Sequence, residues 1–499
     1  MRKYLLIMMA LLFSVSWSVM AVAQDQTLAE KLLIILKQNH QITPEQYNQL
    51  LEQAQQEKSR QKAAVAKQVK AQAAEEAKEY KKANPLGVTA SWKNHEVFLE
   101  TNNGEFTAHV GGYAEVDFGY SSANANLKKA FPTTQGYGDE ARRARIEVDG
   151  TLYHDFTYMA MLDFSNGAGY PLTQDLWLTY VGCPQYANVR VGHMKMPFSL
   201  EELTSDQWLD FTERSLANSF VTENGHDYST GVMLFDTEFN QRMTWAFGGY
   251  IQQTDNGSGK FFGDYTNTNI AARITALPLY EDDGCELLHL GLSYMHRFRS
   301  RNVPATAATY PDLIFTDFPE FHLDPSMVAA KMIADGADII DPEFAFVYGP
   351  FSVQGEYMDA FVTDASTTSA KTTISSPNFG GYYVAAYYFL TGEHRIYNKG
   401  AGVFDRPKLN CNFNPWEGTW GAWELAARYS SLDLTDKTIS GGRETNWTGS
   451  LIWYLNPNVR MLFDYIHAHV DGVSTSTAYN GYLQNGDANI FDSRIQFSF

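Results

Sequence analysis

The sequence predicts an all-β transmembrane barrel of about 16 antiparallel strands, preceded by an α-helical or coiled-coil extension. Three observations lead to this fold class. Apolar and polar residues alternate strictly along most of the chain. Aromatic residues are numerous, with 31 Phe, 29 Tyr and 10 Trp. No long apolar run follows the first two dozen residues, so a helical membrane bundle is excluded. A barrel reconciles these facts, because only every second strand residue faces lipid.

Composition and charge exclude several classes of function. The chain has 499 residues, 38 Lys and Arg against 57 Asp and Glu, and a formal net charge of -19, which argues against a nucleic-acid partner. It contains no HExxH, GxSxG or GxxxxGK[ST] motif. Gly257–Lys260 is too short for a phosphate loop, and His467 and His469 would share a strand face toward lipid. We therefore expect no enzyme, no cofactor and no metal site.

Residues 1–23 have the pattern of a secretory signal peptide. Arg2 and Lys3 supply the positive start, residues 5–13 are apolar, and residues 21–23 offer small side chains for cleavage. A short membrane anchor is the alternative interpretation, although no stop-transfer pattern follows. The signal would take the chain out of the cytoplasm.

Residues 24–84 are rich in Ala, Gln, Glu and Lys and nearly free of aromatics. Thr43 and Gln46 fit a capping box, with Pro44 at the first helical position. Two interpretations stay open for this predicted periplasmic segment. It forms a coiled coil that joins subunits or spaces the barrel from another surface, or it is a single solvated helix with alternating charge.

Period-two alternation defines the strands of the barrel domain, residues 85–499. In the first predicted strand, 106–120, every second residue is apolar or small. In the second, 142–152, Ala, Ile and Val alternate with Arg, Glu and Asp. In the last, 491–499, Phe and Ile alternate with Asp, Arg and Gln. Thirteen further strands are expected near 156–165, 174–182, 187–195, 229–237, 241–252, 268–277, 286–297, 342–349, 350–360, 379–390, 421–432, 446–455 and 458–470.

A soluble β-sandwich or propeller is the alternative to a barrel. The predicted strands are too long and too aromatic for it, and a soluble sheet has no reason to end on an exposed Phe499. Links after even strands are mostly short and links after odd strands mostly long, as in bacterial barrels with periplasmic turns and outer loops. The stretch 391–420 breaks this pattern, through either a miscounted strand or an insertion.

Three cysteines, Cys183, Cys285 and Cys411, fall in the predicted periplasmic links. They form no CxxC motif and have no metal-ligand spacing. Because the count is odd, they cannot all pair within the chain. Two alternatives stay open: one disulfide within the chain, or free thiols at all three positions.

The third long link, near 196–228, is expected to fold inward and narrow the bore. A barrel of this size is wide enough for water, so something must constrict it. The link mixes the charged residues Glu201, Glu202, Asp206 and Arg214 with aromatic side chains. An outward loop with scattered charge is the alternative.

At this point the sequence resembles a known family, the phosphate-selective porins O and P of Gram-negative outer membranes. The resemblance covers most of the chain. It is carried, in order, by Arg142-Arg143-Ala144-Arg145, Asp163-Phe164, Arg190-Val191-Gly192, Phe198-Ser199-Leu200-Glu201, Glu213-Arg214, Leu390-Thr391-Gly392-Glu393, the run from Gly421 to Tyr429, and Trp453-Tyr454-Leu455-Asn456-Pro457. It implies a sixteen-stranded trimeric porin with a basic, anion-selective constriction.

The sequence departs from this family where phosphate would bind. Arg142, Arg143 and Arg214 match family arginines. Four other positions do not match: Tyr113 replaces an arginine, Thr157 and Glu202 replace lysines, and Gln174 replaces an aspartate. A phosphate site needs converging positive donors, and a carboxylate at position 202 would repel the anion. The architecture therefore carries over, and the phosphate specificity does not.

We expect a passive outer-membrane diffusion channel for small hydrophilic solutes or ions, embedded in outer-membrane lipid and assembled as a homotrimer. In this hypothesis Arg142, Arg143, Arg145 and Arg214 form one wall of the pore, and Glu201, Glu202 and Asp206 form the opposing field, with Tyr113 and Gln174 also lining the constriction. A phosphate or polyphosphate channel is the first alternative. A structural or adhesive barrel tethered by its helical segment is the second.

Overall fold

The structure is a computed structural model. It describes residues 87–499 apart from 94–95, 132–134, 166–170, 183–186, 222–226, 252–266, 300–312, 367–374 and 473–484, together with single positions between 43 and 78. The chain forms two compact units, Met1–Gly87 and Val88–Phe499. No helix within the described ranges is long and apolar enough to cross a membrane.

In the first unit, Thr43 and Gln46 make the two hydrogen bonds of a capping box. The backbone N–H of Thr43 donates to Gln46 Oε1 at 3.0 Å, and the backbone N–H of Gln46 donates to Thr43 Oγ1 at 3.2 Å. The predicted signal peptide, 1–23, and most of the predicted helical segment, 24–84, lie outside the described residues.

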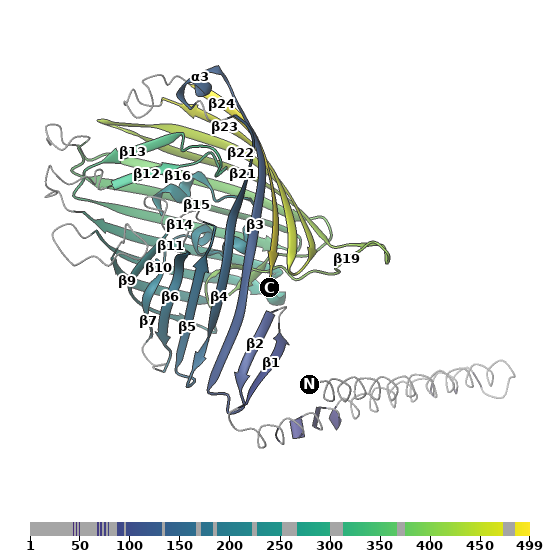
Figure 1. The fold of residues 1–499 in the computed structure, drawn as a ribbon. Coiled ribbons are helices and arrows are strands. Elements are labelled where there is room, and N and C mark those ends of the chain that lie inside the picture. Colours follow the sequence, from purple (N-terminus) through teal and green to yellow (C-terminus); the bar gives the residue numbers. More distant parts are fainter. Residues whose placement is uncertain are drawn as a thin grey trace. The chain divides into compact units, whose positions relative to one another are not determined.

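The second unit is a closed antiparallel barrel of 16 described strands (Figure 1). Each strand pairs with its neighbour along the chain, and the last strand pairs with the first from Ala488–Ala123 to Ser498–Tyr113. The strands are β3 (Phe106–Ala123), β4 (Gln135–Leu152), β5 (Phe156–Asp163), β6 (Leu172–Tyr180), β7 (Asn188–Lys195), β8 (Tyr228–Glu238), β9 (Met243–Ile251), β10 (Thr268–Glu281), β11 (Glu286–Phe298), β14 (Gly336–Tyr348), β15 (Phe351–Thr363), β16 (Asn378–Phe389), β21 (Ala422–Asp436), β22 (Ile439–Asn456), β23 (Val459–Asp471) and β24 (Gly486–Ser498).

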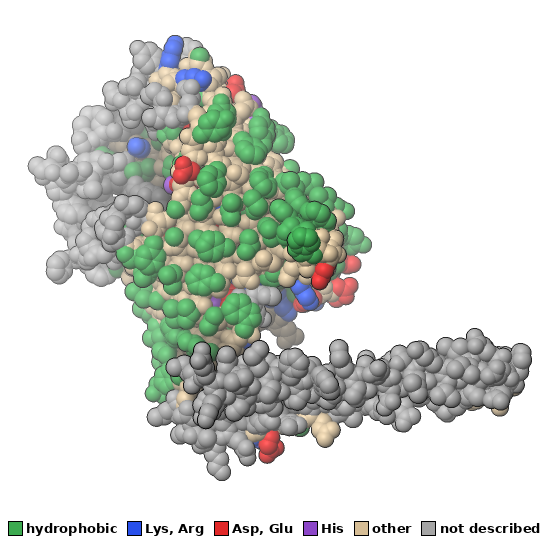
Figure 2. All heavy atoms as spheres, turned by 45° about the vertical axis from the view of Figure 1, so that its right-hand side comes forward, with side chains coloured by type: hydrophobic (Ala, Val, Ile, Leu, Met, Phe, Trp, Pro, Cys, Tyr) green, Lys and Arg blue, Asp and Glu red, His purple; other side chains and the backbone are tan. Residues whose placement is uncertain are grey.

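These strands confirm the sixteen predicted from alternation. The outer face is apolar and the inner face polar, so Phe491, Ile495 and Phe497 of β24 are exposed while Asp492 and Arg494 are buried. Figure 2 shows hydrophobic side chains spread over the barrel wall. This reverses the pattern of a soluble protein, because lipid surrounds the wall and the lumen is polar.

Several strands are longer than predicted at the end where the long loops lie. β22 begins at Ile439 rather than near 446, and β14 begins at Gly336 rather than 342. In β22 the outward side chain of Arg443 is exposed. The outward residues are no longer apolar at this end, but the backbone pairing between strands continues. Alternation therefore underestimated the length of the strand.

A hairpin that the sequence did not predict extends the sheet beside β3. Strands β1 (Val88–Lys93) and β2 (Glu96–Thr101) pair with each other, and β2 pairs with β3 from Val97–Val110 to Glu100–Thr107. Each has 6 residues. That is too short for alternation to separate a strand from its surroundings.

The links between strands lie at the two ends of the barrel (Figure 1). We call the end with the links β4–β5 and β6–β7 the turn side, and the end with the links β3–β4 and β7–β8 the loop side. Among loop-side links, L3 (196–227) contains α4 (Leu200–Leu203) and the 3-10 turns η1 (Asp206–Trp208) and η2 (Leu216–Phe220). L5 (299–335) contains β12 (Leu313–Asp317) and β13 (Val328–Met332). Only residues 437–438 join β21 to β22. The link from β3 to β4 contains α3 (Ala125–Ala130).

The stretch that broke the predicted pattern is an insertion on the turn side and not a miscounted strand. Residues 390–421, which we call the turn insertion, contain the hairpins β17 (Ile396–Asn398) with β18 (Val403–Asp405) and β19 (Phe413–Asn414) with β20 (Thr419–Trp420). Cys411 in this insertion and Cys285 beside η3 (Asp282–Gly284) are free thiols. Cys183 lies outside the described residues.

L5 sits against the inner face of β3 at a glycine. A Cβ added to Gly119 would lie 2.3 Å from the ring of Phe321, which is buried in L5. We expect Gly119→Val to displace Phe321 and to lower the free energy of unfolding by about 1–3 kcal/mol, as overpacking does. Urea unfolding in detergent measures this change. Gly449→Val is the control, since a Cβ there meets no atom within 4 Å; equal losses in the two variants would refute this seat for L5.

Candidate functional site

L3 lies inside the barrel and is bonded to many of its strands. The backbone N–H of Ser199 donates to Ser293 Oγ of β11 at 3.2 Å. The backbone N–H of Thr212 donates to Asp464 Oδ2 of β23 at 2.8 Å. The side chains of L3 from Phe198 to Val221 are mostly buried. L3 therefore lies inside the lumen of the described barrel, and we refer to this region as the constriction.

The first helical turn of L3 is anchored by a buried carboxylate. Glu356 of β15 accepts hydrogen bonds from the backbone N–H groups of Leu200 at 3.0 Å and Glu201 at 2.8 Å, and from the hydroxyl of Tyr383 at 2.6 Å. These N–H groups open α4, where a carboxylate is favoured. Glu356 thus holds the start of L3 on the wall.

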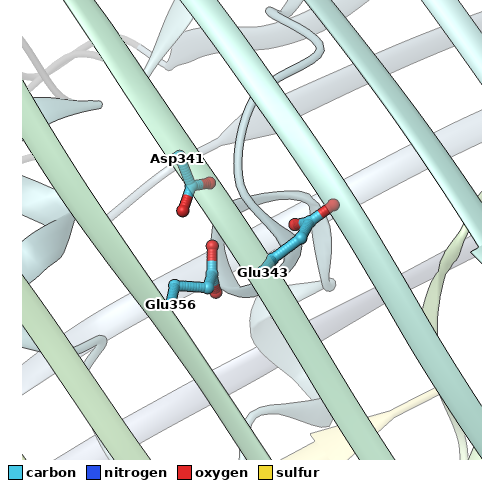
Figure 3. Close-up of side chains that lie close together, drawn as sticks. All are labelled: Asp341, Glu343 and Glu356. Atoms are coloured by element: carbon cyan, nitrogen blue, oxygen red, sulfur yellow. The ribbon is translucent and has the colours of Figure 1, made fainter.

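Two further carboxylates, Asp341 and Glu343, lie beside Glu356 (Figure 3). One oxygen atom from each of the three lies within 4.8 Å of the others, and all three side chains are buried. Carboxylate oxygens are the ligands that Ca²⁺ prefers. However, Glu356 already binds L3, and Glu343 forms an ion pair with Arg273 at 2.8 Å. Of these three carboxylates, only Asp341 has both oxygens without a hydrogen bond to the part of the chain that the structure describes.

Asp206 of L3 is the centre of the constriction. Its carboxylate lies 2.5 Å from Arg214, 2.7 Å from Arg145 and 3.3 Å from Arg143. Tyr113 accepts a hydrogen bond from Arg145 at 2.7 Å and donates one to Asp206 at 3.4 Å. One acidic side chain of the loop is therefore shared by three guanidinium groups.

A β-bulge brings the neighbouring arginine into the same network. The register of β3 and β4 shifts between Glu115 and Val116, so Arg142 is the extra residue of β4. Strict alternation would point it away from Arg143. Instead its guanidinium donates two hydrogen bonds to Glu213 of L3, at 2.6 and 3.0 Å.

The result is one connected network, the L3 cluster, in which six cations meet seven carboxylates. Its cations are Arg142, Arg143, Arg145, Lys195, Arg214 and Arg494, and its carboxylates are Glu115, Asp117, Asp163, Glu202, Asp206, Glu213 and Asp227. The sequence interpretation set arginines and carboxylates on opposite walls. The structure differs, because they are in direct contact.

Two residues predicted to line the constriction are not part of the L3 cluster. Glu201 accepts hydrogen bonds from the backbone N–H and hydroxyl of Ser215 and pairs with Arg428 of β21 at 3.1 Å. Gln174 lies on β6 beside a register shift and makes no hydrogen bond to L3 within the described ranges. Neither belongs to the L3 cluster.

Several functional residues were missed by sequence reasoning. Arg494 of β24 binds Asp117 through two bonds of 2.7 Å and reaches Glu213 at 3.0 Å. Arg428 joins L3 to L5, because it contacts Glu201 and lies 2.7 Å from Glu320. Both arginines lie on the polar face of their strands. Their place in the alternating pattern was the signal that could have identified them as lumen residues.

The turn insertion also enters the lumen and meets L3 from the other side. Arg395 lies 3.1 Å from Asp210 of L3 and packs on the rings of Tyr387 and Phe404. Tyr397 shares a hydrogen bond of 2.6 Å with His289 of β11. Leu200 of L3 belongs to the same apolar cluster as Phe404 and Tyr397. The constriction is therefore supported from both ends.

Burial and ion pairing act against each other on the carboxylates of L3. Burial alone would raise the pKa of Asp206, but Arg143, Arg214 and other cations hold that pKa well below its usual value. Arg142 and Arg143 likewise hold the pKa of Glu213 well below its usual value against the effect of burial. At Glu202 burial prevails and raises the pKa to about 7, against Arg214 and Lys195.

This difference predicts a pH effect on selectivity. Below about pH 7 Glu202 is neutral, whereas Asp206 and Glu213 stay ionised, so the lumen becomes more positive as the pH falls. We expect the reversal potential in a KCl gradient to shift toward anions between pH about 8 and about 6. In Glu202→Gln the part of the shift due to this group disappears. A shift of unchanged size in the variant would contradict the assignment.

Few charges of the L3 cluster reach water. Arg142 and Glu213 have 19% and 15% of their side chains exposed, and Lys195 and Asp227 have 14% and 21%. These four groups already form two pairs: Arg142 lies 2.6 Å from Glu213, and Lys195 lies 3.5 Å from Asp227. The accessible part of the constriction is thus two ion pairs, with no net charge.

Comparison with known proteins gives one family. The model of the family described as phosphate-selective porin O and P matches residues 110–499. Porin O of Pseudomonas aeruginosa is 26% identical over 431 residues, which cover 80% of this chain and 90% of that protein. An uncharacterized protein of Caulobacter vibrioides is 26% identical over 420 residues, covering 82% and 77% of the two chains.

Solved structures with some likeness include an anion-selective porin from Comamonas acidovorans, with 12% identity, a TM-score of 0.47, and coverage of 79% of this chain and 100% of that one. The outer-membrane channel DcaP of Acinetobacter baumannii has 12% identity, a TM-score of 0.48, and coverage of 79% and 97%. The family match itself extends over the barrel from within β3 to the last residue.

Proposed function

Because the chain belongs to the phosphate-selective porin O and P family, we propose that it is a passive channel of that family whose constriction has lost the phosphate site. The chain is an outer-membrane porin, a channel for small solutes rather than an enzyme. The single observation that carries the proposal is the L3 cluster, in which the protein's own carboxylates occupy every arginine that would otherwise bind the anion.

The chemistry of anion binding supports this proposal. A phosphate needs free donors with net positive charge around it. Here Asp206 takes the donors of three arginines, and Glu213 takes those of Arg142 and Arg494. A phosphate entering the constriction would have to displace carboxylates that are bound to the loop itself. We infer that small hydrophilic solutes pass without a tight binding step.

A gain-of-function experiment tests the proposal. We expect Glu202→Lys combined with Thr157→Lys to make chloride current sensitive to millimolar phosphate, because the first change adds a cation in L3 and the second adds one on the inner wall of β5. The matched control is Asp282→Lys combined with Glu417→Lys, two exposed turn-side positions that receive lysine as well. A native channel already blocked by phosphate would overturn the proposal.

We also propose that three copies associate through the wall of β5, β6 and β7. These strands have 8, 9 and 8 residues, whereas β22 has 18. A tilted strand needs about 9–11 residues to cross a bilayer. A second copy against this short wall would cover it better than lipid. Cysteine cross-linking between copies tests this: Val191→Cys of β7 is expected to cross-link, and Leu292→Cys of β11 is not.

The N-terminal segment is proposed to lie in the periplasm after removal of residues 1–23. Support comes from the turn side, where the backbone N–H of Tyr153 donates to the carbonyl of Glu105 just before β3. Short turns of bacterial barrels face the periplasm. Deletion of 24–84 is expected to leave single-channel conductance unchanged. Loss of conductance on deletion would contradict a purely external role for this segment.

A further inference from the structure

The inner wall is covered unevenly. L3 is bonded to inward side chains of β11, β15, β21, β23, β24, β3 and β4. On the turn-side half of β4 to β9, in contrast, inward side chains stay partly exposed, among them Thr157, Met159, Trp177 and Phe235. The water-accessible surface of the lumen therefore includes this part of the wall.

Three carboxylates lie on this accessible surface, and we call them the acidic wall: Glu147 and Asp149 of β4 and Asp175 of β6. All three are only partly buried, and the side chain of Asp149 is 40% exposed. They share the inward parity of Arg145 and Trp177. None of the three pairs with a Lys or Arg within 4 Å in the described ranges.

Three cations lie near the acidic wall, and two of them, Lys195 and Arg145, already pair with carboxylates of the L3 cluster. The third is Arg190. The Arg190 guanidinium of β7 stacks on Trp177 at 3.7 Å from the ring centre, lies 4.9 Å from the centre of Phe235, and donates to Thr179 Oγ1 at 3.0 Å. Asp175 accepts a hydrogen bond from the indole N–H of the same Trp177 at 3.0 Å. His109 binds Asp149 at 2.5 Å. Lys195 and Arg145 are balanced by their own carboxylate partners in the L3 cluster. Three carboxylates then remain against the one guanidinium of Arg190, so the accessible wall is net negative.

The exposed charges of L3 do not offset this field, because they form two neutral pairs. We propose that the acidic wall makes the channel prefer small cations over anions, the opposite of a basic constriction. The wall acts through its potential and not as a binding site, since low-dielectric surroundings focus the field of unpaired charges in a narrow aqueous path. This inference rests on the proposed function, because an anion held at L3 would dominate selectivity.

The test is the reversal potential of the full-length protein in a planar bilayer under a KCl gradient. We expect potassium permeability to exceed chloride permeability roughly tenfold at low salt, and the excess to shrink at high salt through screening. A chloride-preferring or non-selective native channel would overturn the inference. That result is distinguishable from failure of the proposed function, which would appear as phosphate block or as absence of conductance.

A charge-matched pair of variants locates the effect. The combination Glu147→Gln, Asp149→Asn and Asp175→Asn is expected to bring the permeability ratio to about one or below it. The control combination Asp282→Asn, Asp283→Asn and Glu417→Gln removes the same charge from exposed turn-side positions and should keep the native ratio. An unchanged ratio in the first combination would overturn the assignment to this wall. The salt dependence of the native channel keeps the inference testable if that variant does not fold.

Discussion

Asp206→Asn is expected to shift the selectivity of the channel toward anions and to loosen L3. The carboxylate lies within 3.3 Å of Arg143, Arg145 and Arg214, all of which are nearly buried. Asparagine keeps the shape but removes the carboxylate that the three guanidinium groups share. Each of them then keeps only its other carboxylate partners in the L3 cluster. Breaking a buried pair in this way costs about 3–5 kcal/mol. Reversal potential and thermal unfolding in detergent measure the two effects.

The control for this variant is Glu417→Gln, which removes one negative charge from an exposed turn-side position. It should leave both the reversal potential and the unfolding temperature close to native values. If Asp206→Asn behaves like this control, other negative charges balance the arginines of the constriction. Asp206 and the L3 cluster then do not set the charge of the lumen.

Arg428→Met is expected to release L3 and L5 together. The guanidinium lies 3.1 Å from Glu201 of L3 and 2.7 Å from Glu320 of L5, and it donates to the carbonyl of Glu213 at 3.0 Å. Methionine leaves two buried carboxylates unpaired, at a cost of about 3–5 kcal/mol. With both loops loosened, single-channel conductance should rise and fluctuate more.

Arg443→Met provides the matched comparison for Arg428→Met. Arg443 pairs with Asp433, but the two side chains are 57% and 32% exposed. An exposed pair contributes about 0–1 kcal/mol, so conductance and stability should be unchanged. Equal effects of the two substitutions would show that Arg428 does not join the loops.

The barrel was predictable because lipid imposes a pattern on each strand separately. Alternation in β3 or β24 needs no knowledge of the neighbouring strand, so all sixteen strands could be found from local sequence. The hairpin of β1 and β2 escaped because six residues carry too few alternations. Its place is decided by pairing with β3, which is a property of the sheet.

The site was only partly predictable. Arg142, Arg143, Arg145 and Arg214 were found as charged residues of the right strand and loop, and they do lie together. Their counter-charges were not assigned, because a pair such as Arg142 with Glu213 joins a strand to a loop 71 positions away, and the sequence does not show which loop residue the strand meets. The bulge that turns Arg142 inward is likewise invisible to a pattern of strict alternation.

The family resemblance left the same question open for a different reason. Matching arginines suggest an anion site, and the replaced lysines argue against one. The pairing of those arginines with Asp206 and Glu213 supports the proposed loss of the anion site, since a donor already bound to a carboxylate cannot hold phosphate without releasing it. We therefore propose that the carboxylates of the L3 cluster neutralise the arginines of the constriction.

Phosphate titration of single-channel chloride current in the native protein tests this claim most directly. We expect the current to be unchanged up to millimolar phosphate, because the arginines of the constriction are already paired. Block of the current by phosphate at or below that range would contradict the account, since it would require free cationic donors at the constriction.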